Sequence, residues 1–457
     1  MLKSIVKSFN VQSNCLQHKN QVANHESLHG ANSVPQTLQL VNRDDSIEIE
    51  EGMQCKCYHD IEDVKSVEEG VNVEAGHDAN ANANSTFLHA VINMVGMLIG
   101  LGQLSTPYAV QNGGWASSFL LIGLGVMCAY SSHLLGKCLE RNPNLRSYVD
   151  IGHQAFGKKG SILAATFIYM EIFMALVSYT ISLHDNLISV FLETHLNLHW
   201  AKLSTSQILT TVAMLIAVPS LWLRDLSSIS FLSTCANHKI PVLQLHNIPS
   251  ISGLYVFSLA GHIVFPDLYK AMKDPSKFTK VSIVSFTLVT ILYTTLGFMG
   301  AKMFGSEVNP QITLSLPPKS IVSKIALWAT VLTPMTKYAL EFAPFAIQLE
   351  HKLPSSMSVR TKMIIRGSVG SFLLLVILVL ALSVPYFQYV LSLTGSLVSI
   401  AICLILPCGF YTKIFWGHMP KTLLVLNLSL IGLGLFFGVI GTISSSKLLV
   451  KNFHGAS

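Results

Sequence analysis

Charged residues are scarce in this 457-residue chain, since Asp, Glu, Lys and Arg together make up 12% of it. Soluble domains carry about 25% charged residues, and here 51% of the residues are apolar. Lipid must cover so large an apolar surface, which predicts an integral membrane protein. The net charge of +6 is small and no basic stripe is interleaved with aromatic residues, so we expect no nucleic-acid partner.

The chain also lacks the short motifs of membrane enzymes and pumps. It has no Walker A loop and no G-x-S-x-G elbow, and its one H-E-x-x-H match, His25 to His29, lies in the polar stretch before the first apolar span, so neither ATP hydrolysis nor membrane hydrolysis is indicated. We expect no enzyme activity and no cofactor. The eight cysteines are scattered, and Cys55 with Cys57 form a C-x-C without a second pair, which favours free thiols over a zinc site or a disulfide framework.

No secretory signal peptide follows Met1, so the first membrane span is expected to target the chain. Residues 1–86 are polar, have no hydrophobic period and contain an acidic run between Asp44 and Glu51. This composition is typical of a disordered tail, which we place in the cytosol. We expect a transmembrane transporter domain over 87–446 and a short C-terminal tail over 447–457.

Ten stretches are apolar and long enough to cross about 30 Å of hydrocarbon. They run approximately 87–110, 115–138, 161–192, 207–223, 251–271, 281–304, 321–348, 361–384, 387–410 and 422–446. The sequence therefore predicts an all-α, multi-pass membrane protein.

Basic residues favour the cytoplasmic side of a membrane protein. With the N-terminal tail inside, this rule is met by Lys137, Arg141, Arg146, Lys158, Lys159 and Arg224. The later basic loops, around Lys270–Lys280, Lys352–Arg366 and Lys413–Lys421, also belong inside, and the count of crossings then fails by one. The failure falls on 225–250, which contains His238, Lys239 and Pro241 and no long apolar run. Either a span is missing there, which we favour, or this marginal segment is forced across.

Two spans carry backbone-breaking residues at membrane depth. The first contains Gly100, Gly102 and Pro107, and the second contains Gly261 and Pro266. Glycine permits non-helical backbone and proline removes an N–H donor, so both stretches predict an interrupted helix. Gly-mediated helix packing is the alternative for the first. Interrupted helices leave backbone groups and helix ends that suit an amino acid zwitterion, and one in each half of the bundle is typical of inverted-repeat transporters.

Ionisable side chains within the spans allow two interpretations each. His262 can relay a proton near neutral pH or donate one hydrogen bond to a carbonyl. Glu171 can be a proton site or a helix-packing hydrogen bond, because an ionised group in lipid needs a partner. Lys337 and Glu341 lie four residues apart near the expected cytosolic end of a span, so a local ion pair or snorkelling accounts for them.

Three motifs in order resemble the amino acid/auxin permease family, and most of all the plant and fungal vacuolar amino acid transporters. They are NMVGMLIGLGQLSTPYAVQNGGW, YSSHLLGKCLERNPNLRSYVDIGHQAFGKKG and GLYVFSLAGHIVFPDLYKAMKDPSKF, and the similarity covers about 86–446. The resemblance implies a LeuT-like inverted-repeat bundle of the APC superfamily, with eleven helices and proton-coupled transport of neutral amino acids at the vacuolar membrane.

The same resemblance implies a set of site residues. The substrate's amino and carboxylate groups would be held by Gly100, Gly102, Ser105, Thr106, Ser258, Gly261, His262 and Phe265. Asn93 and Thr333 would flank the cation position, with Glu171 as a further proton-coupling residue. The expected partners are the amino acid, protons and the lipid bilayer. The chain departs from the family where a full fifth helix is expected after Arg224, so a non-transporting sensor or inactive paralogue is the alternative function.

Overall fold

The structure is a computed structural model that describes residues 85–190, 238–317, 321–352, 357–384 and 386–455. Across these ranges the regular structure is helical, apart from one bridge that pairs Ser85 with Met272. The first part contains α2 (Phe87–Leu98), α3 (Gly102–Gly113), α4 (Ser117–Arg141) and α5 (Tyr148–Val190). In α5 the backbone is non-helical at Phe156 and Gly157, so this element is two helices that join at a kink.

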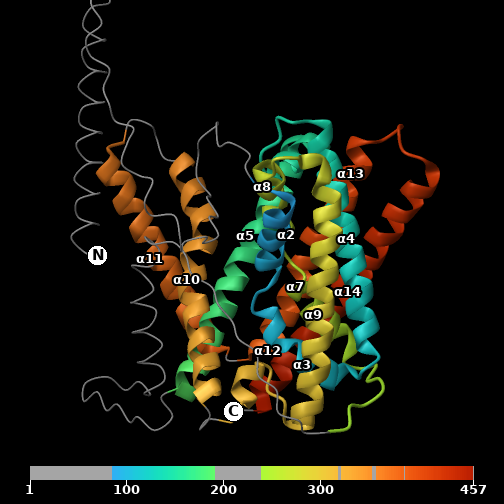
Figure 1. Cartoon of the computed structure of the whole chain (residues 1–457). Coiled ribbons are helices and arrows are strands. Elements are labelled where there is room, and N and C mark those ends of the chain that lie inside the picture. The colour runs from blue at the N-terminus through green and yellow to red at the C-terminus, as the bar shows by residue number, and fades with distance from the viewer. Residues whose placement is uncertain (1–84, 191–237, 318–320, 353–356, 385, 456–457) are drawn as a thin grey trace, which may run out of the picture. The chain divides into compact units, whose positions relative to one another are not determined.

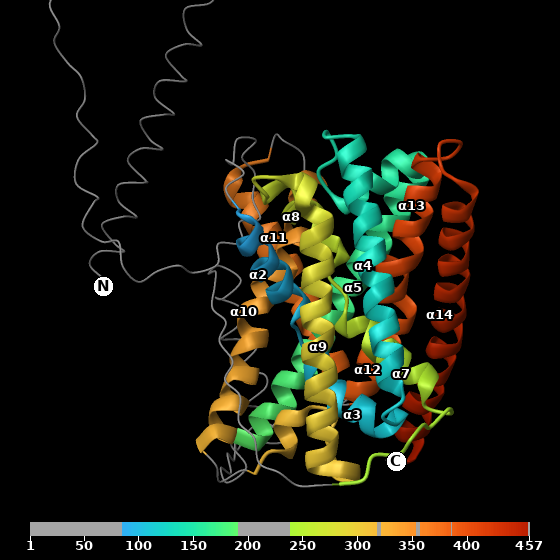
Figure 2. The same cartoon turned by 45° about the vertical axis from the view of Figure 1, so that its right-hand side comes forward.

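The second part begins with α7 (Ile248–Ser258), the short turn η1 (His262–Val264), α8 (Phe265–Ala271), η2 (Pro275–Lys277) and α9 (Phe278–Phe304). After the turns η3 (Gly305–Glu307) and η4 (Ile312–Ser315) come α10 (Ile321–Lys352) and α11 (Val359–Ser383). The chain ends with α12 (Phe387–Thr394), two π-helical turns η5 (Gly395–Ser399) and η6 (Ala401–Ile405), α13 (Leu406–Ile414) and α14 (Lys421–Gly455). In both views α10 and α11 lie on one flank of the bundle and α14 on the opposite flank (Figures 1 and 2).

The described helices match the predicted apolar stretches closely. Seven of them are long and apolar enough to cross a membrane, and the bent pair α2 and α3 makes an eighth span if it counts as one. The predicted span 321–348 coincides with α10, a helix that does not reach that apolarity because it carries Lys324, Lys337 and Glu341. The predicted span 207–223 lies outside the described residues, and α14 continues beyond residue 446 to Gly455.

The basic loops gather at one end of the bundle. The Arg141 guanidinium lies 4.8 Å from the centre of the Phe415 ring, which joins the end of α4 to the loop after α13. Arg146 and Lys270 are close enough to interact electrostatically. The backbone of Ser85 bonds to Ala271 and Lys273, so α2 begins where α8 ends. These contacts put the loops around Arg141–Arg146, Lys270–Lys273 and Phe415 on a common face of the bundle.

Residues 238–247 form no helix and lie at the opposite end. The N–H of His238 donates to the carbonyl of Lys302 at the end of α9, and that of Gln244 donates to Gly113 at the end of α3. This placement lets α7 begin on the far face and deliver Lys270 to the basic face, as the charge rule requires. Residues 225–237 of the segment where the count of crossings fails lie outside the described residues.

The turn between α9 and α10 is fixed to α5 at this far end. Gln311 donates to the Asp185 carboxylate at 2.8 Å and accepts from Ser182 and Asn186 at 2.6 and 2.8 Å. Thr313 donates to the Asn186 side chain at 2.9 Å. Buried polar groups stabilise a structure only when they are paired, and this set is paired throughout.

A close backbone contact joins α7 to the π-helical turn η5. A side chain at Gly395 would overlap the backbone of Gly253, and one at Gly253 would overlap the backbone of Ser392. Ser250 and Ser392 exchange a hydrogen bond beside this contact. Apolar surface provides no driving force between helices in lipid, so such small-residue contacts supply the packing that holds the two segments together.

Gly395→Ala should therefore destabilise the bundle by about 1–3 kcal/mol, the usual effect of overpacking a filled site. The thermal unfolding midpoint of the purified full chain in detergent measures this. Gly409→Ala is the matched control, because nothing lies within 4 Å of a side chain at that position. Equal midpoints for the two variants would contradict the packing described here.

Candidate substrate site at two interrupted helices

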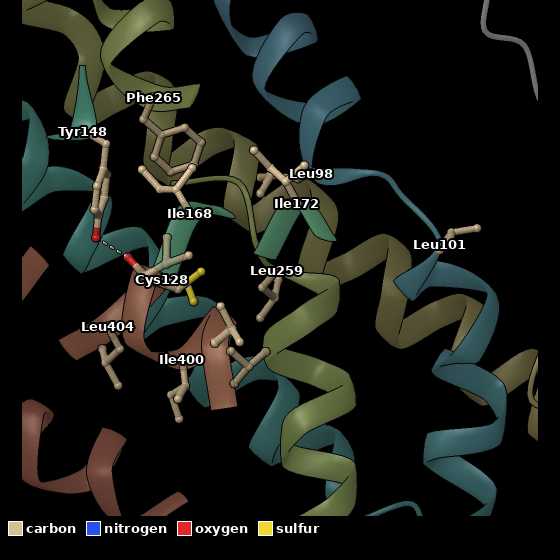
Figure 3. Close-up of a cluster of buried hydrophobic side chains, with 14 of the residues drawn as sticks. Leu98, Leu101, Cys128, Tyr148, Ile168, Ile172, Leu259, Phe265, Ile400 and Leu404 are labelled. Atoms are coloured by element: carbon tan, nitrogen blue, oxygen red, sulfur yellow. Dashed lines mark hydrogen bonds between the residues drawn. The ribbon is translucent and has the colours of Figure 1, made fainter. Parts of the chain in front are cut away.

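The first interruption separates α2 from α3. The two helices meet at 61° across Ile99, Gly100 and Leu101, and Figure 3 shows this extended segment between Leu98 and Leu101. The predicted break is thus present, but Pro107 does not cause it, because Pro107 lies inside α3. Proline there removes a hydrogen bond within the helix without ending it.

The second interruption separates α7 from α8. α7 ends at Ser258, and Leu259, Ala260 and Gly261 precede the short turn η1. Pro266 lies in the first turn of α8, where a missing N–H costs nothing because that group has no helical partner. Sequence therefore predicted this interruption correctly, with proline marking the start of the following helix.

The two interruptions lie against each other inside the bundle. A side chain at Gly102 would overlap the backbone of Ser258, so the start of α3 touches the end of α7. A side chain at Gly261 would lie 3.0 Å from a methyl group of Leu98, so the second break touches the end of α2. The end of α2, the start of α3 and the end of α7 therefore converge on one small region.

Helix ends carry partial charges of opposite sign. The start of α3 presents backbone N–H groups, and the ends of α2 and α7 present carbonyl groups. A region that holds both kinds of end can receive the carboxylate and the ammonium group of an amino acid together. The predicted substrate residues Gly100, Gly102, Ser258 and Gly261 are all in this region.

Two carbonyl groups at the end of α2 accept hydrogen bonds from side chains of distant helices. The Tyr293 hydroxyl on α9 donates to the Leu98 carbonyl at 2.8 Å. The Lys337 ammonium on α10 donates to the Ile99 carbonyl at 3.3 Å. The interruption is therefore held open by donors that replace the missing helical N–H groups.

The predicted hydroxyl residues of α3 differ in their bonding. The Thr106 hydroxyl donates to the Gln103 carbonyl at 2.8 Å, within its own helix. The Ser105 hydroxyl is buried and has no hydrogen-bond partner in the described part of the chain. A buried hydroxyl without a partner is costly, which makes Ser105 the more available of the two for a ligand.

His262 and Phe265 lie just beyond the second interruption and are fully buried. His262 Nε2 lies 2.9 Å from the Ser131 hydroxyl and 3.1 Å from the Cys128 carbonyl on α4. This bonding matches the structural interpretation of the histidine, and its other ring nitrogen, Nδ1, has no partner among the described residues. Phe265 packs against His262 and Phe286 in the aromatic core, where Figure 3 shows it above Leu259.

Glu171 lies on α5 and pairs with the π-helical turn η5. The Ser399 hydroxyl lies 2.8 and 2.9 Å from its two carboxylate oxygens. This is the helix-packing hydrogen bond that sequence offered as one interpretation. π-helical turns occur often at functional sites, so the contact leaves the proton-site interpretation open as well.

The residues expected at the cation position lie on α2 and α10. Asn93 is partly buried on α2, before the interruption. The Thr333 hydroxyl donates to the Ala329 carbonyl of its own helix at 2.8 Å. Thr333, Lys337 and Glu341 recur every four residues and so share one face of α10.

The predicted electrostatic interaction between Lys337 and Glu341 is present, but its predicted place near the end of a span was wrong. Lys337 lies in the middle of α10 and reaches across to the Ile99 carbonyl. Sequence reasoning also missed Tyr293 and Ser399, because their partners are far away in the chain and no local pattern marks them. A lysine within an apolar stretch was the one available signal, since such a charge needs a partner at membrane depth.

A separate groove of about 820 Å³ runs between α4 and α9. Its lining includes Ile122, Val126, Ile283 and Ile291, all of which are exposed on the outer surface. None of its lining residues belongs to either interruption. The groove therefore faces the surrounding hydrocarbon and is distinct from the candidate site.

The helical bundle, its apolar spans and its paired interruptions define a multi-pass membrane protein of the transporter class. A sequence model described as transmembrane amino acid transporter protein matches residues 83–242 and 236–446. The chain belongs to this family, whose members are transporters and not enzymes. The two matched stretches overlap at 236–242, within the 225–250 segment where the count of crossings fails.

Individual relatives agree with the family. The chain is 59% identical over 435 residues to amino acid transporter AVT1H of Arabidopsis thaliana, covering 89% of this chain and 98% of the relative. It is 36% identical over 391 residues to amino acid transporter AVT1E of the same plant, covering 81% and 74%. It is 24% identical over 408 residues to the vesicular inhibitory amino acid transporter of Xenopus tropicalis, covering 79% and 77%.

The alignment with the first relative also bears on the missing span. It runs over 435 positions, whereas 89% of the 457 residues is about 407 residues. The relative therefore has residues without a counterpart in this chain. This difference is large enough to hold one membrane helix of about 20 residues.

Gly102→Ala should weaken amino acid binding at least about tenfold, because the added methyl group must separate the start of α3 from the end of α7. Binding of radiolabelled amino acids to the purified full chain measures the effect. Gly96→Ala on α2 is the matched control, since nothing lies within 4 Å of a side chain there. Unchanged binding in Gly102→Ala would exclude this contact from the site.

Proposed function

We propose that this protein is a secondary transporter that carries neutral amino acids across the vacuolar membrane, driven by protons. Family membership supports amino acid transport, and the paired interruptions support a site at membrane depth. The contact between Gly102 and Ser258 carries the proposal, because it brings helix ends of opposite sign together. Backbone groups of this kind recognise the ammonium and carboxylate groups that all amino acids share.

The mechanism follows from a LeuT-like arrangement, which we propose for the bundle. The two interrupted helices would lie in opposite repeats, and the substrate would bind between them near the midplane. The gathering of basic loops on one face supports an N-terminus in the cytosol. Alternating access would then result from rocking of the interrupted helices against the rest of the bundle.

In this mechanism the start of α3, with Gly102, Ser105 and Thr106, faces the substrate carboxylate. The carbonyl ends of α2 and α7, with Gly100 and Ser258, face the ammonium group. Gly261, His262 and Phe265 complete the second interruption, and Asn93, Thr333 and Glu171 are assigned to proton coupling.

Uptake of radiolabelled neutral amino acids into vacuolar vesicles, with and without a pH gradient, tests the function. One pH unit supplies about 1.36 kcal/mol per proton, which sustains about a tenfold concentration ratio at one proton per substrate. We expect accumulation that disappears when the gradient is collapsed. Uptake that is indifferent to the gradient would exclude proton coupling.

The same assay separates transport from substrate sensing. A chain that binds amino acids without moving them, and that gains flux when about 20 apolar residues are inserted near position 233, would be a non-transporting member of the family. Restored flux would also identify the shortened 225–250 segment as the cause.

Glu171→Gln tests the role of the buried carboxyl group. Glutamine can still accept the Ser399 hydrogen bond but cannot exchange a proton. If Glu171 takes part in coupling, the variant should lose most of the stimulation by a pH gradient while it keeps its fold. Ser399→Ala is the companion variant, because it removes the hydrogen bond and keeps the carboxyl group. Full stimulation in Glu171→Gln would limit Glu171 to helix packing.

A further inference from the structure

Lys337 lies in the middle of α10 and donates a hydrogen bond to another span. Its ammonium group donates to the Ile99 carbonyl, in the interruption between α2 and α3. The next residue, Gly100, has no side chain, and one placed there would come within 3.9 Å of the Lys337 nitrogen. The lysine therefore lies directly on the interrupted backbone.

This position is where a bound cation would be expected. The carbonyl end of α2 carries partial negative charge and has lost its helical donors. Unwound carbonyl groups in interrupted spans coordinate the coupling cation in many secondary transporters. Here a covalently attached ammonium group occupies that end of the helix.

The titratable surroundings of Lys337 come from several elements. Glu341 lies one turn further on α10 and interacts with it electrostatically. α5 contributes Glu171 and Tyr179, both of which interact with Glu341. α9 contributes Tyr293, bonded to Leu98. Arg360 and Lys362 lie in the first turn of α11, which follows the C-terminal end of α10 in the chain. The turn η4 has no titratable residue.

The charges of Lys337, Glu341 and Glu171 can balance one another. The set holds one ammonium group, on the partly buried Lys337, and two carboxyl groups, on the partly buried Glu341 and the buried Glu171. Uncompensated charge at membrane depth is expensive, so the set is neutral when one carboxyl group is protonated. A proton that moves from Lys337 to an ionised Glu341 converts an ammonium and a carboxylate into an amine and a carboxylic acid, and the total charge is unchanged.

We propose that Lys337 is the coupling cation of this transporter. Its protonated side chain occupies the carbonyl end of α2, and transfer of that proton to Glu341 releases the Ile99 carbonyl. The N–H bond of the ammonium breaks, an O–H bond forms on the Glu341 carboxylate, and no other reactant is needed. This inference rests on the proposed proton-coupled function and names the group that carries the proton at the interruption.

Loss of the proton weakens the hydrogen bond from Lys337 to the Ile99 carbonyl in the interruption between α2 and α3. A charged ammonium group donates a stronger hydrogen bond than a neutral amine. The Tyr293 hydroxyl on the adjacent Leu98 carbonyl keeps the same charge throughout the physiological range. Of the two donors, therefore, only Lys337 makes a hydrogen bond to this segment whose strength depends on protonation.

Two variants at this position separate coupling from structure. Lys337→Arg keeps a positive charge that cannot be lost, and Lys337→Gln keeps a hydrogen-bond donor without charge. Lys324→Arg is the matched control, because Lys324 is exposed near the start of the same helix. The full chain is reconstituted in liposomes with radiolabelled alanine, leucine and glutamine as probes.

Each variant is measured in two modes. Counterflow exchange of amino acid requires binding and alternating access without net proton movement, whereas accumulation in a pH gradient requires coupling. We expect wild type and Lys324→Arg to accumulate amino acid about tenfold per pH unit. Lys337→Arg and Lys337→Gln both keep a donor for the Ile99 carbonyl, so we expect slower but measurable counterflow and no accumulation above equilibration.

The outcomes distinguish this inference from the proposed function. Wild type without counterflow would contradict the proposed transport activity, and wild type with counterflow but no response to the gradient would contradict its proton coupling. A coupled wild type together with normal accumulation in either Lys337 variant would overturn the inference alone. Loss of counterflow in both variants, with Lys324→Arg intact, would make Lys337 a structural or binding residue and would also overturn it.

Discussion

The structure depends on how two interrupted helices satisfy their backbone in a medium without water. Each unpaired polar group in hydrocarbon costs several kcal/mol, so an interruption persists only where other groups take over its hydrogen bonds. Tyr293 and Lys337 do so for the end of α2. Close approach at Gly102 and Ser258 places the ends of α3 and α7 together. The candidate site is the region where the polar backbone groups of these helix ends lie together.

Sequence predicted the elements of this arrangement better than their contacts. The apolar runs located the helices, because a span must be long and apolar wherever it lies in the bundle. Glycine and proline located both interruptions, although Pro107 is inside α3 and the break precedes Gly102. Gly102 is needed for close approach to Ser258, a requirement that depends on a residue far away in the chain. The sequence around Gly102 does not show whether the glycine is needed for close packing or for a non-helical backbone.

The remaining misses have the same cause. Lys337 and Glu341 have the spacing of a local ion pair, yet Lys337 bonds to the Ile99 carbonyl across the bundle. The π-helical turn that brings Ser399 to Glu171 has no recognisable sequence signal, because the apolar run continues through it. The orientation from charge counting stays a prediction, to which the structure adds that the loops near Arg141, Lys270 and Phe415 lie on one face and His238 lies on the other.

An experimental structure of the full chain with a bound amino acid tests the central claim most directly. The account predicts ligand density between residues 99–102 and 258–261, with the carboxylate toward the start of α3 and the ammonium group toward the ends of α2 and α7. Density elsewhere, or a continuous helix through either interruption, would contradict it.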